Sequence, residues 1–327
     1  MPKHPDRRYR VVAASLVALA GALAAAAALQ LQPAAASEVS PQQWTAAPSA
    51  AVSAAREDTL PTAAPVPGAL LAEARTRLAA SRAGPGREVD RWAVRLASNT
   101  RDSEAALARY SVYRPLILET LKKHGLPLDL AFLPWVESEW VTDTASVAGA
   151  DGMWQFMAGT ARGYGLEVSE YVDERRDPVR ATDAAARHLL DLFRETNDWH
   201  TTLAAYNAGI GRAGPVRGAF WRRRASLPAE TRAYVPRVLA AARVGRSPAA
   251  WGLTPPTKPP LRFREVWVAG GVTLDAVAAR VGVPARAVRD LNPHLVRGVT
   301  PPGRRWPVRV PAVAAPRVTP IPPQRHP

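Results

Sequence analysis

The chain has 327 residues, of which 47% are apolar and 32 are proline, and none is cysteine. This length is enough to bury one substantial core and a smaller one, and the lack of cysteine excludes disulfides, thiolate metal sites and a cysteine nucleophile. The net charge of +15, from 43 basic and 28 acidic side chains, favours a polyanionic partner: nucleic acid, anionic lipid or an anionic cell wall.

The N-terminal residues have the layout of a secretory signal peptide over residues 1–36. Several basic side chains precede an apolar run from Val11 to Leu29, and the small residues Ala34 to Ala36 follow it. The alternative is an uncleaved membrane anchor, because the run approaches the ~20 residues that a membrane span needs. We expect an exported protein of the periplasm or cell envelope, cleaved before Ser37 or associated with the membrane through this segment. Export argues against nucleic acid as the partner.

The middle of the chain is predicted to be a mainly α domain. Residues 37–68 are rich in Ala, Pro, Ser and Thr without periodicity, which is typical of a disordered tether. Helical spacing then dominates residues 69–250, and no convincing strand alternation interrupts it. The expected helices run to Ser98, from Ser103 to Gly125, from Pro127 through Glu137, Thr160 to Tyr164, Asp183 to Thr196 capped by Thr182, Thr201 to Ala208, and after Pro236.

A second, smaller module is predicted after a proline-rich linker over residues 251–261. Residues 262–312 read as strand, helix, helix and strand, which is a small α+β (βααβ) unit. The expected elements are Arg262 to Val268, Thr273 to Val281, Ala285 to Leu291 and Trp306 to Val310. Residues 313–327 are predicted to be a disordered tail.

Glu137 is the strongest candidate for acid–base chemistry. It lies in an aromatic stretch, close to Trp135 and Trp140, and no Lys or Arg occurs between Lys123 and Arg162. A carboxyl group in apolar surroundings loses hydration, which raises its pKa and allows it to act as a general acid near neutral pH. Glu139 is two positions further on, about 200° round a helix, so we expect it to face elsewhere if the helix persists.

Four separated motifs carry a resemblance to a known family. They are Glu137-Ser138, the run Ser146 to Gln155 (SVAGADGMWQ), the run Ala205 to Gly209 (AYNAG) and Tyr234-Val235-Pro236. In this order they resemble the lytic transglycosylases of the lysozyme-like (SLT, glycoside hydrolase family 23) type, and among them the membrane-bound lytic murein transglycosylase D-like members. The resemblance covers residues 90–245, with the core motifs in 126–240, and implies a lysozyme-like helical domain.

The resemblance implies the reaction and the substrate. The partner would be the glycan strands of peptidoglycan, with the MurNAc–GlcNAc β-1,4 bond cleaved without water. Glu137 would protonate the glycosidic oxygen and then accept the proton of the MurNAc C6 hydroxyl, leaving a 1,6-anhydro end. No cofactor is implied, and no metal site is predicted because His188 and His200 lack metal-ligand spacing.

The resemblance also implies the residues that would contact the substrate. Ser146 and Gln155 match positions where a hydroxyl and an amide would bond the sugar N-acetyl groups. Tyr206 matches a tyrosine whose hydroxyl orients the catalytic carboxyl group, with Asn207 beside it. Tyr234 would close the opposite wall. Read without the family, both tyrosines are more typical of core aromatics of amphipathic helices.

Two alternatives remain open on the residues. The first is a muramidase that hydrolyses the same bond with Asp143 or Asp151 positioning water, although both are typical turn or cap residues. The second is a non-catalytic peptidoglycan-binding protein.

The C-terminal module resembles a LysM glycan-binding domain. Gly270 to Leu274 stands where LysM domains have a Gly-Asp-Thr-Leu turn, and Leu291-Asn292-Pro293 matches the end of the second helix. The turn lacks the usual Asp, so both a glycan-binding module and a degenerate docking module stay open.

Overall fold

The structure, a computed structural model, describes residues 44–46 and 86–312, which divide into two compact units. The larger unit comprises residues 86–261 with 293–297, and the smaller comprises 44–46, 262–292 and 298–312. Within these described ranges no helix is long and apolar enough to cross a membrane. The predicted signal segment, most of the tether, residues 69–85 and the tail lie outside them.

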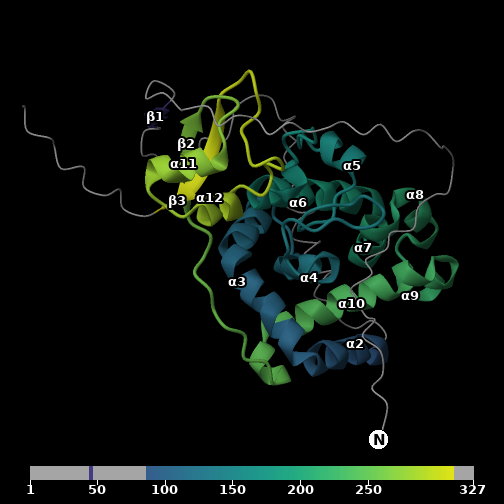
Figure 1. Cartoon of the computed structure of the whole chain (residues 1–327). Helices are drawn as coiled ribbons and strands as arrows, with labels where there is room; N and C mark the ends of the chain where they lie inside the picture. Colours follow the sequence, from purple (N-terminus) through teal and green to yellow (C-terminus); the bar gives the residue numbers. More distant parts are fainter. Residues whose placement is uncertain (1–43, 47–85, 313–327) are drawn as a thin grey trace, which may run out of the picture. The chain divides into compact units, whose positions relative to one another are not determined.

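The larger unit is helical (Figure 1), which confirms the mainly α prediction. Between residues 86 and 261, β pairing is confined to isolated bridges. The helices are α2 (Gly86–Ser98), α3 (Thr100–Lys123), α4 (Leu133–Glu137), α5 (Ala158–Gly163), α6 (Pro178–Thr196), α7 (Trp199–Ala208), α8 (Ile210–Ala213), α9 (Phe220–Arg223) and α10 (Ala229–Arg246). Short 3₁₀ turns are η3 (Leu128–Phe132), η4 (Glu174–Arg176), η5 (Gly214–Val216), η6 (Arg224–Ser226) and η7 (Pro248–Trp251).

Helix α10 organises the core of this unit. It packs against α2, α4 and α7. Two of the four sequence motifs lie on or next to α4 and α7, and α10 itself carries a third, Tyr234-Val235-Pro236. The interior is aromatic: Trp140, Trp154 and Trp199 are fully buried. Each large apolar side chain buried in this way contributes about 1.5–3 kcal/mol to folding, so burial of these rings is a main stabilising term.

The start of α6 differs from the prediction. The helix begins at Pro178, because the Asp177 carboxylate accepts hydrogen bonds from the backbone N–H groups of Val179 at 2.8 Å and Arg180 at 3.2 Å. An acidic cap followed by proline at the first helical position is a strong start signal. Thr182 is therefore inside the helix, where its hydroxyl donates to the Pro178 carbonyl at 2.6 Å.

The prediction that the last helix follows Pro236 is wrong. Pro236 lies inside α10, which already begins at Ala229. A proline in a helix interior removes one hydrogen bond and costs about 3 kcal/mol. The helix continues because Tyr234, Val235 and Val238 on either side of the proline are buried in the core.

The smaller unit has the predicted strand, helix, helix, strand order. Its elements are β2 (Phe263–Val268), α11 (Leu274–Val281), α12 (Ala285–Leu291) and β3 (Trp306–Pro311), with β2 and β3 antiparallel from the pair Phe263 and Pro311 to the pair Val268 and Trp306. A further strand, β1 (Trp44–Ala46), pairs antiparallel with β2. It falls in the range predicted to be a tether, where three residues are too few to show alternation.

Polar side chains fix the helices of this unit. The Thr273 hydroxyl accepts from the Ala276 N–H and caps α11. The Asn292 side chain donates to the Arg309 carbonyl at 2.7 Å and accepts from its N–H at 2.9 Å. This pair of bonds ties the end of α12 to β3, which explains an asparagine at that position on structural grounds.

Candidate active site around Glu137

Glu137 is the last residue of the short helix α4. The helix stops there because Glu139 and Trp140 adopt left-handed backbone angles, with φ of 53° and 57°. Such angles cost roughly 1–2 kcal/mol per residue for side chains other than glycine. The turn places the Trp140 ring 4.9 Å from Tyr110 and 5.7 Å from Trp135 between ring centroids, and this burial offsets the strain.

Glu139 is directed away from Glu137, as expected, but for a different reason. The helix does not persist to Glu139, so the predicted 200° separation does not apply. Instead the Glu139 carboxylate pairs with the Arg109 guanidinium of α3 at 2.8 Å, and its carbonyl accepts from Arg109 Nε at 2.7 Å. Glu139 therefore supports the turn that ends α4.

The Glu137 carboxyl group is enclosed by protein atoms, although the residue as a whole is only partly buried. Burial raises the pKa of Glu137 to about 7, and the nearby Glu230 carboxylate adds to this rise. A hydrogen bond donated by the Tyr234 hydroxyl to Glu137 Oε1 and the charge of Arg237 act in the opposite direction. Desolvation is the largest influence, as the sequence predicted. The counter-charge of Arg237 comes from α10, so the local sequence gave no sign of it.

The hydrogen bonds of the two tyrosines differ from the expected ones. The hydroxyl predicted to orient the carboxyl group, that of Tyr206, donates instead to the Trp154 carbonyl at 2.8 Å. Tyr234, predicted only to close the opposite wall, makes the hydrogen bond to Glu137. Burial and the nearby Glu137 charge raise the pKa of both phenols well above the ordinary value, so both stay protonated and can donate.

Ser146 and Gln155 both form hydrogen bonds with the loop that joins α4 to α5. The Ser146 hydroxyl accepts from the Ala150 N–H at 3.0 Å. The Gln155 amide donates to the carbonyls of Thr144 and Gly152, both at 2.9 Å. These bonds close a tight turn, and neither side chain is hydrogen-bonded to Glu137. Their assignment to the sugar N-acetyl groups remains a prediction.

Asn207 joins two helices of the site. Its side-chain carbonyl accepts from the hydroxyl of Thr231, a buried residue of α10, at 2.9 Å. Since Tyr206 and Asn207 lie on α7 while Tyr234 and Arg237 lie on α10, this bond helps fix the two helices relative to each other.

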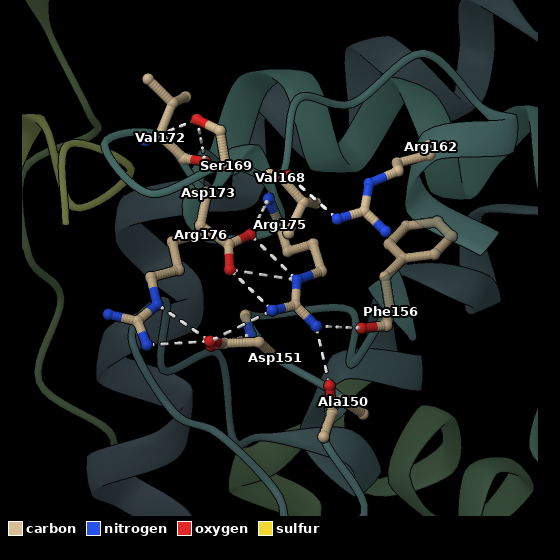
Figure 2. Close-up of polar contacts among 12 residues, drawn as sticks. Ala150, Asp151, Phe156, Arg162, Val168, Ser169, Val172, Asp173, Arg175 and Arg176 are labelled. Carbon is tan, nitrogen blue, oxygen red and sulfur yellow. Dashed lines mark hydrogen bonds and ion pairs between the residues drawn. The ribbon is translucent and has the colours of Figure 1, made fainter. Parts of the chain in front are cut away.

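A buried ion cluster holds the loop in place, and the sequence prediction missed it. Figure 2 shows the Arg175 guanidinium between the Asp173 carboxylate, at 2.6 Å, and the Phe156 carbonyl, at 3.1 Å. The same guanidinium donates to the Gly149 carbonyl at 2.7 Å, and Arg176 pairs with Asp151 at 2.8 Å. The close mixture of acidic and basic residues from Asp173 to Asp177 was the available signal for internal pairing.

The two carboxylates of the loop, Asp143 and Asp151, have different surroundings. Asp151 is buried and bound by Arg176, and it also accepts from the Gly152 N–H at 2.7 Å. Asp143 is exposed. Gly152 itself sits against the chain of η4, since a Cβ added there would lie 1.8 Å from the Arg175 carbonyl oxygen.

The aromatic neighbours of Tyr206 include His188, which lies 5.3 Å away between ring centroids. Its Nδ1 is 3.1 Å from the Tyr164 hydroxyl, and burial lowers the pKa of His188 to about 4. His188 is therefore neutral near pH 7. Among the described residues, no group of three or more His, Asp or Glu side chains is placed to hold a metal ion.

Two parts of the chain match models of known domain families. Residues 115–223 match the model of the transglycosylase SLT domain. The chain contains an SLT domain. Glu137, Tyr206 and the Arg175 cluster lie within the matched range, whereas Tyr234 lies beyond it. Residues 262–320 match the LysM-like domain of the lytic transglycosylase MltD, which agrees with the predicted second module.

The SLT domain also has curated relatives of greater length. The chain is 33% identical over 195 residues to the membrane-bound lytic murein transglycosylase D of Escherichia coli K12, covering 56% of this chain and 43% of that protein. It is 33% identical over 156 residues to the peptidoglycan transglycosylase gp16 of Escherichia phage T7, covering 45% and 12%. The chain thus spans less than half the length of these relatives.

Solved structures similar to this chain include those of two lytic transglycosylases. One is an inactive mutant of Slt from Pseudomonas aeruginosa, 23% identical, with a TM-score of 0.36 over 44% of this chain and 25% of that one. The other is the soluble lytic transglycosylase of Escherichia coli, 26% identical, with the same TM-score and coverages.

Proposed function

We propose that this chain is a peptidoglycan lytic transglycosylase, which cleaves the MurNAc–GlcNAc β-1,4 bond without water and leaves a 1,6-anhydro-MurNAc end. The observation that carries the proposal is a single enclosed carboxyl group, Glu137, with a pKa of about 7 and a hydrogen bond from Tyr234, within an SLT domain. The activity of the named relatives supports the same reaction.

Glu137 is suited to both proton transfers that the reaction needs. With a pKa of about 7, a substantial fraction of the enzyme holds the proton at neutral pH and can donate it to the glycosidic oxygen as the bond to C1 breaks. The resulting carboxylate then takes the proton from the C6 hydroxyl while that oxygen bonds to C1. The Tyr234 hydroxyl and the Arg237 charge favour this carboxylate, so they stabilise the enzyme between the two steps.

The neighbouring carboxylates favour a one-carboxylate mechanism over hydrolysis. An inverting hydrolase needs a second carboxylate about 6.5–9.5 Å from the acid to activate water. Asp151 is held by Arg176 and Glu139 by Arg109, so neither is available as a base. Asp143 and Glu230, whose charge acts on Glu137, remain as candidates for the second carboxylate of the muramidase alternative. The enclosed Glu137 argues in turn against a protein that only binds glycan.

The second module and the N-terminal segment fit a role at the cell wall. We assign glycan-strand binding to the LysM-like module, although its turn has Gly271 where the usual Asp would stand. The proposed substrate and the second module support a location in the cell envelope, which the protein would reach through the predicted signal or anchor of residues 1–36.

The experiment is digestion of purified sacculi by the wild type and by the Glu137→Gln variant, followed by mass spectrometry of the released muropeptides. General acid–base groups are typically worth about 10²–10⁴-fold, and one residue in both roles should reach the upper end. Wild type should release products lighter by one water than hydrolysed ones. Glu119→Gln is the matched control, since Glu119 is exposed on α3 and its change should leave activity within severalfold.

Two results would contradict the proposal. Solubilisation by folded Glu137→Gln within tenfold of wild type would remove Glu137 from the chemistry. Products carrying the added water would instead assign the muramidase reaction.

A further inference from the structure

Helix α2 lies alongside α10 (Figure 1) and precedes the residues 115–223 that match the SLT domain. Its only aromatic residue is Trp92, which is half-buried and packs against the core. Two ion pairs also join α2 to its neighbours: Asp90 pairs with Arg243 of α10, and Glu88 pairs with Arg224 of η6 at 2.6 Å. The Trp92 ring is therefore held at the contact between α2 and α10.

The Trp92 ring lies beneath a cation of α10. The guanidinium carbon of Arg237 is 5.3 Å from the ring centroid, and that of Arg95, one turn further along α2, is 5.4 Å from it. Cations within about 6 Å of a ring centroid are attracted by the negative face of the ring. Among the described residues Arg237 forms no ion pair with an acidic side chain, so the Trp92 ring, rather than a carboxylate, orients its guanidinium.

Arg237 shares a face of α10 with the tyrosine that binds Glu137. Tyr234, which donates to Glu137 Oε1, precedes Arg237 by three residues, and side chains at this spacing are neighbours on a helix. The positive charge of Arg237 lowers the pKa of Glu137, whereas the Glu230 carboxylate on the same helix raises it. Tyr206 of α7 also faces Glu137 and stays protonated. Among the described side chains, Arg237 is thus the cation that acts on the Glu137 carboxyl group.

We propose that Trp92 is a positioning residue for the reaction: its ring holds the Arg237 guanidinium toward Glu137 and so stabilises the carboxylate that exists between the two proton transfers. The role of that carboxylate rests on the proposed function, whereas the contact does not. An arginine side chain has many rotamers, and fixing one in advance removes the cost of reorganising it when charge develops. A neutral ring suits this task, because a carboxylate partner would cancel the field of Arg237 at Glu137.

The direct test is the titration of Glu137 in the full chain labelled with ¹³C at the glutamate carboxyl groups, followed by NMR. The Glu137→Gln variant identifies the signal. Trp92→Leu should raise the pH at which Glu137 titrates by about half a unit, because a cation–π contact at a half-buried site has roughly this strength. Arg237→Gln should raise it by at least as much. In the Arg237→Gln background, Trp92→Leu should add nothing, because both changes remove the same interaction.

Two variants serve as controls for this titration. Arg95→Gln removes the other guanidinium over the same ring and should leave the titration in place, since Arg95 is not among the charges that act on Glu137. Trp92→Phe keeps a smaller aromatic face, so its titration should lie between those of wild type and Trp92→Leu, and it carries the test if the leucine variant does not fold. An unshifted titration in the folded Trp92 variants, or a full further shift on adding Trp92→Leu to Arg237→Gln, would overturn the proposal.

Kinetics on glycan strands test the positioning role itself. At about pH 5.5, where the acid is protonated in both proteins, Trp92→Leu should lower kcat about threefold and leave KM within twofold, because the contact supports the carboxylate rather than substrate binding. The basic limb of kcat/KM should move up by the same half unit. A loss confined to KM would refute the positioning role and make Trp92 a binding residue. Products carrying an added water would contradict the proposed function but leave the titration result intact, whereas anhydro products with an unshifted titration would refute this inference alone.

Discussion

The raised pKa of Glu137 has a consequence for stability that can be measured without substrate. Replacing Glu137 by Gln removes the titration but keeps the size and an acceptor for the Tyr234 hydroxyl. A carboxyl group whose pKa is higher in the folded state holds its proton more tightly there. Its stabilising effect is complete below the unfolded pKa and is lost as the pH rises through the folded pKa.

The magnitude follows from the two pKa values. The shift from 4.5 to about 7 is roughly 2.5 units, and at 1.36 kcal/mol per unit it is worth about 3 kcal/mol. Below pH 4.5 the carboxyl group is protonated in both the folded and the unfolded wild type, so the free energy of unfolding does not change with pH through this group. Between pH 4.5 and 7 the unfolded chain releases the proton first, and the free energy of unfolding of the wild type falls. The Glu137→Gln variant lacks this decline.

The assay is urea denaturation of both proteins at pH 4.5 and pH 8, followed by tryptophan fluorescence. The stability of Glu137→Gln relative to wild type should rise by about 3 kcal/mol from the lower to the higher pH. Glu119, exposed on α3, supplies the control: Glu119→Gln should change stability by less than about 0.5 kcal/mol at either pH. A relative stability that does not change with pH would mean that the Glu137 carboxyl group is solvated and that the desolvation argument is wrong.

Two further predictions test the surroundings of the site. Tyr234→Phe removes a hydrogen bond that favours the carboxylate, so the pKa of Glu137 and the basic limb of the kcat/KM profile should move up by about one pH unit. The control Tyr206→Phe should leave that limb in place. A downward movement in Tyr234→Phe would contradict the assigned bond. Gly152→Ala places a Cβ 1.8 Å from a backbone oxygen at φ 79°, so it should lower the free energy of unfolding in urea by at least about 3 kcal/mol. Gly149→Ala meets open space at φ 88°, so it should lower that free energy only by the ~1–2 kcal/mol of left-handed strain. Equal losses in the two glycine variants would show that the loop does not pack against η4.

The parts of the fold that depend on local pattern were predictable from the sequence. Helix α3 buries Tyr110, Ile117 and Leu121 at helical spacing, and the order of elements after residue 262 follows from short alternating and periodic runs. Boundaries were missed where a local rule was overridden or overlooked. Pro236 is tolerated inside α10 because burial of the helix exceeds the cost of one lost hydrogen bond. Thr182 was taken as the cap of α6, and the start signal of Asp177 followed by Pro178 was overlooked.

The candidate site was predictable as a set of residues but not as a set of contacts. The aromatic density around Glu137 correctly indicated desolvation, since that depends on nearby sequence. The hydrogen bond of Tyr234, rather than Tyr206, to Glu137 and the nearby charge of Arg237 depend on how α10 packs against α4 and α7. No spacing within the chain encodes that packing. The hydrogen bonds from Arg175 to the distant carbonyls of Gly149 and Phe156 could not be predicted from the sequence for the same reason.

The contact between Tyr234 and Glu137 also determines the stage of synthesis and folding at which the pKa of Glu137 can rise. The two residues are 97 positions apart, and the later one lies on the last helix of the larger unit. A ribosome that has released the chain only as far as α9 has made Glu137 without the helix that encloses it. In such a nascent chain the carboxyl group is open to water and has the acidity of an ordinary glutamate. The acid–base group is completed only when α10 docks, which delays its activity until the unit has finished folding.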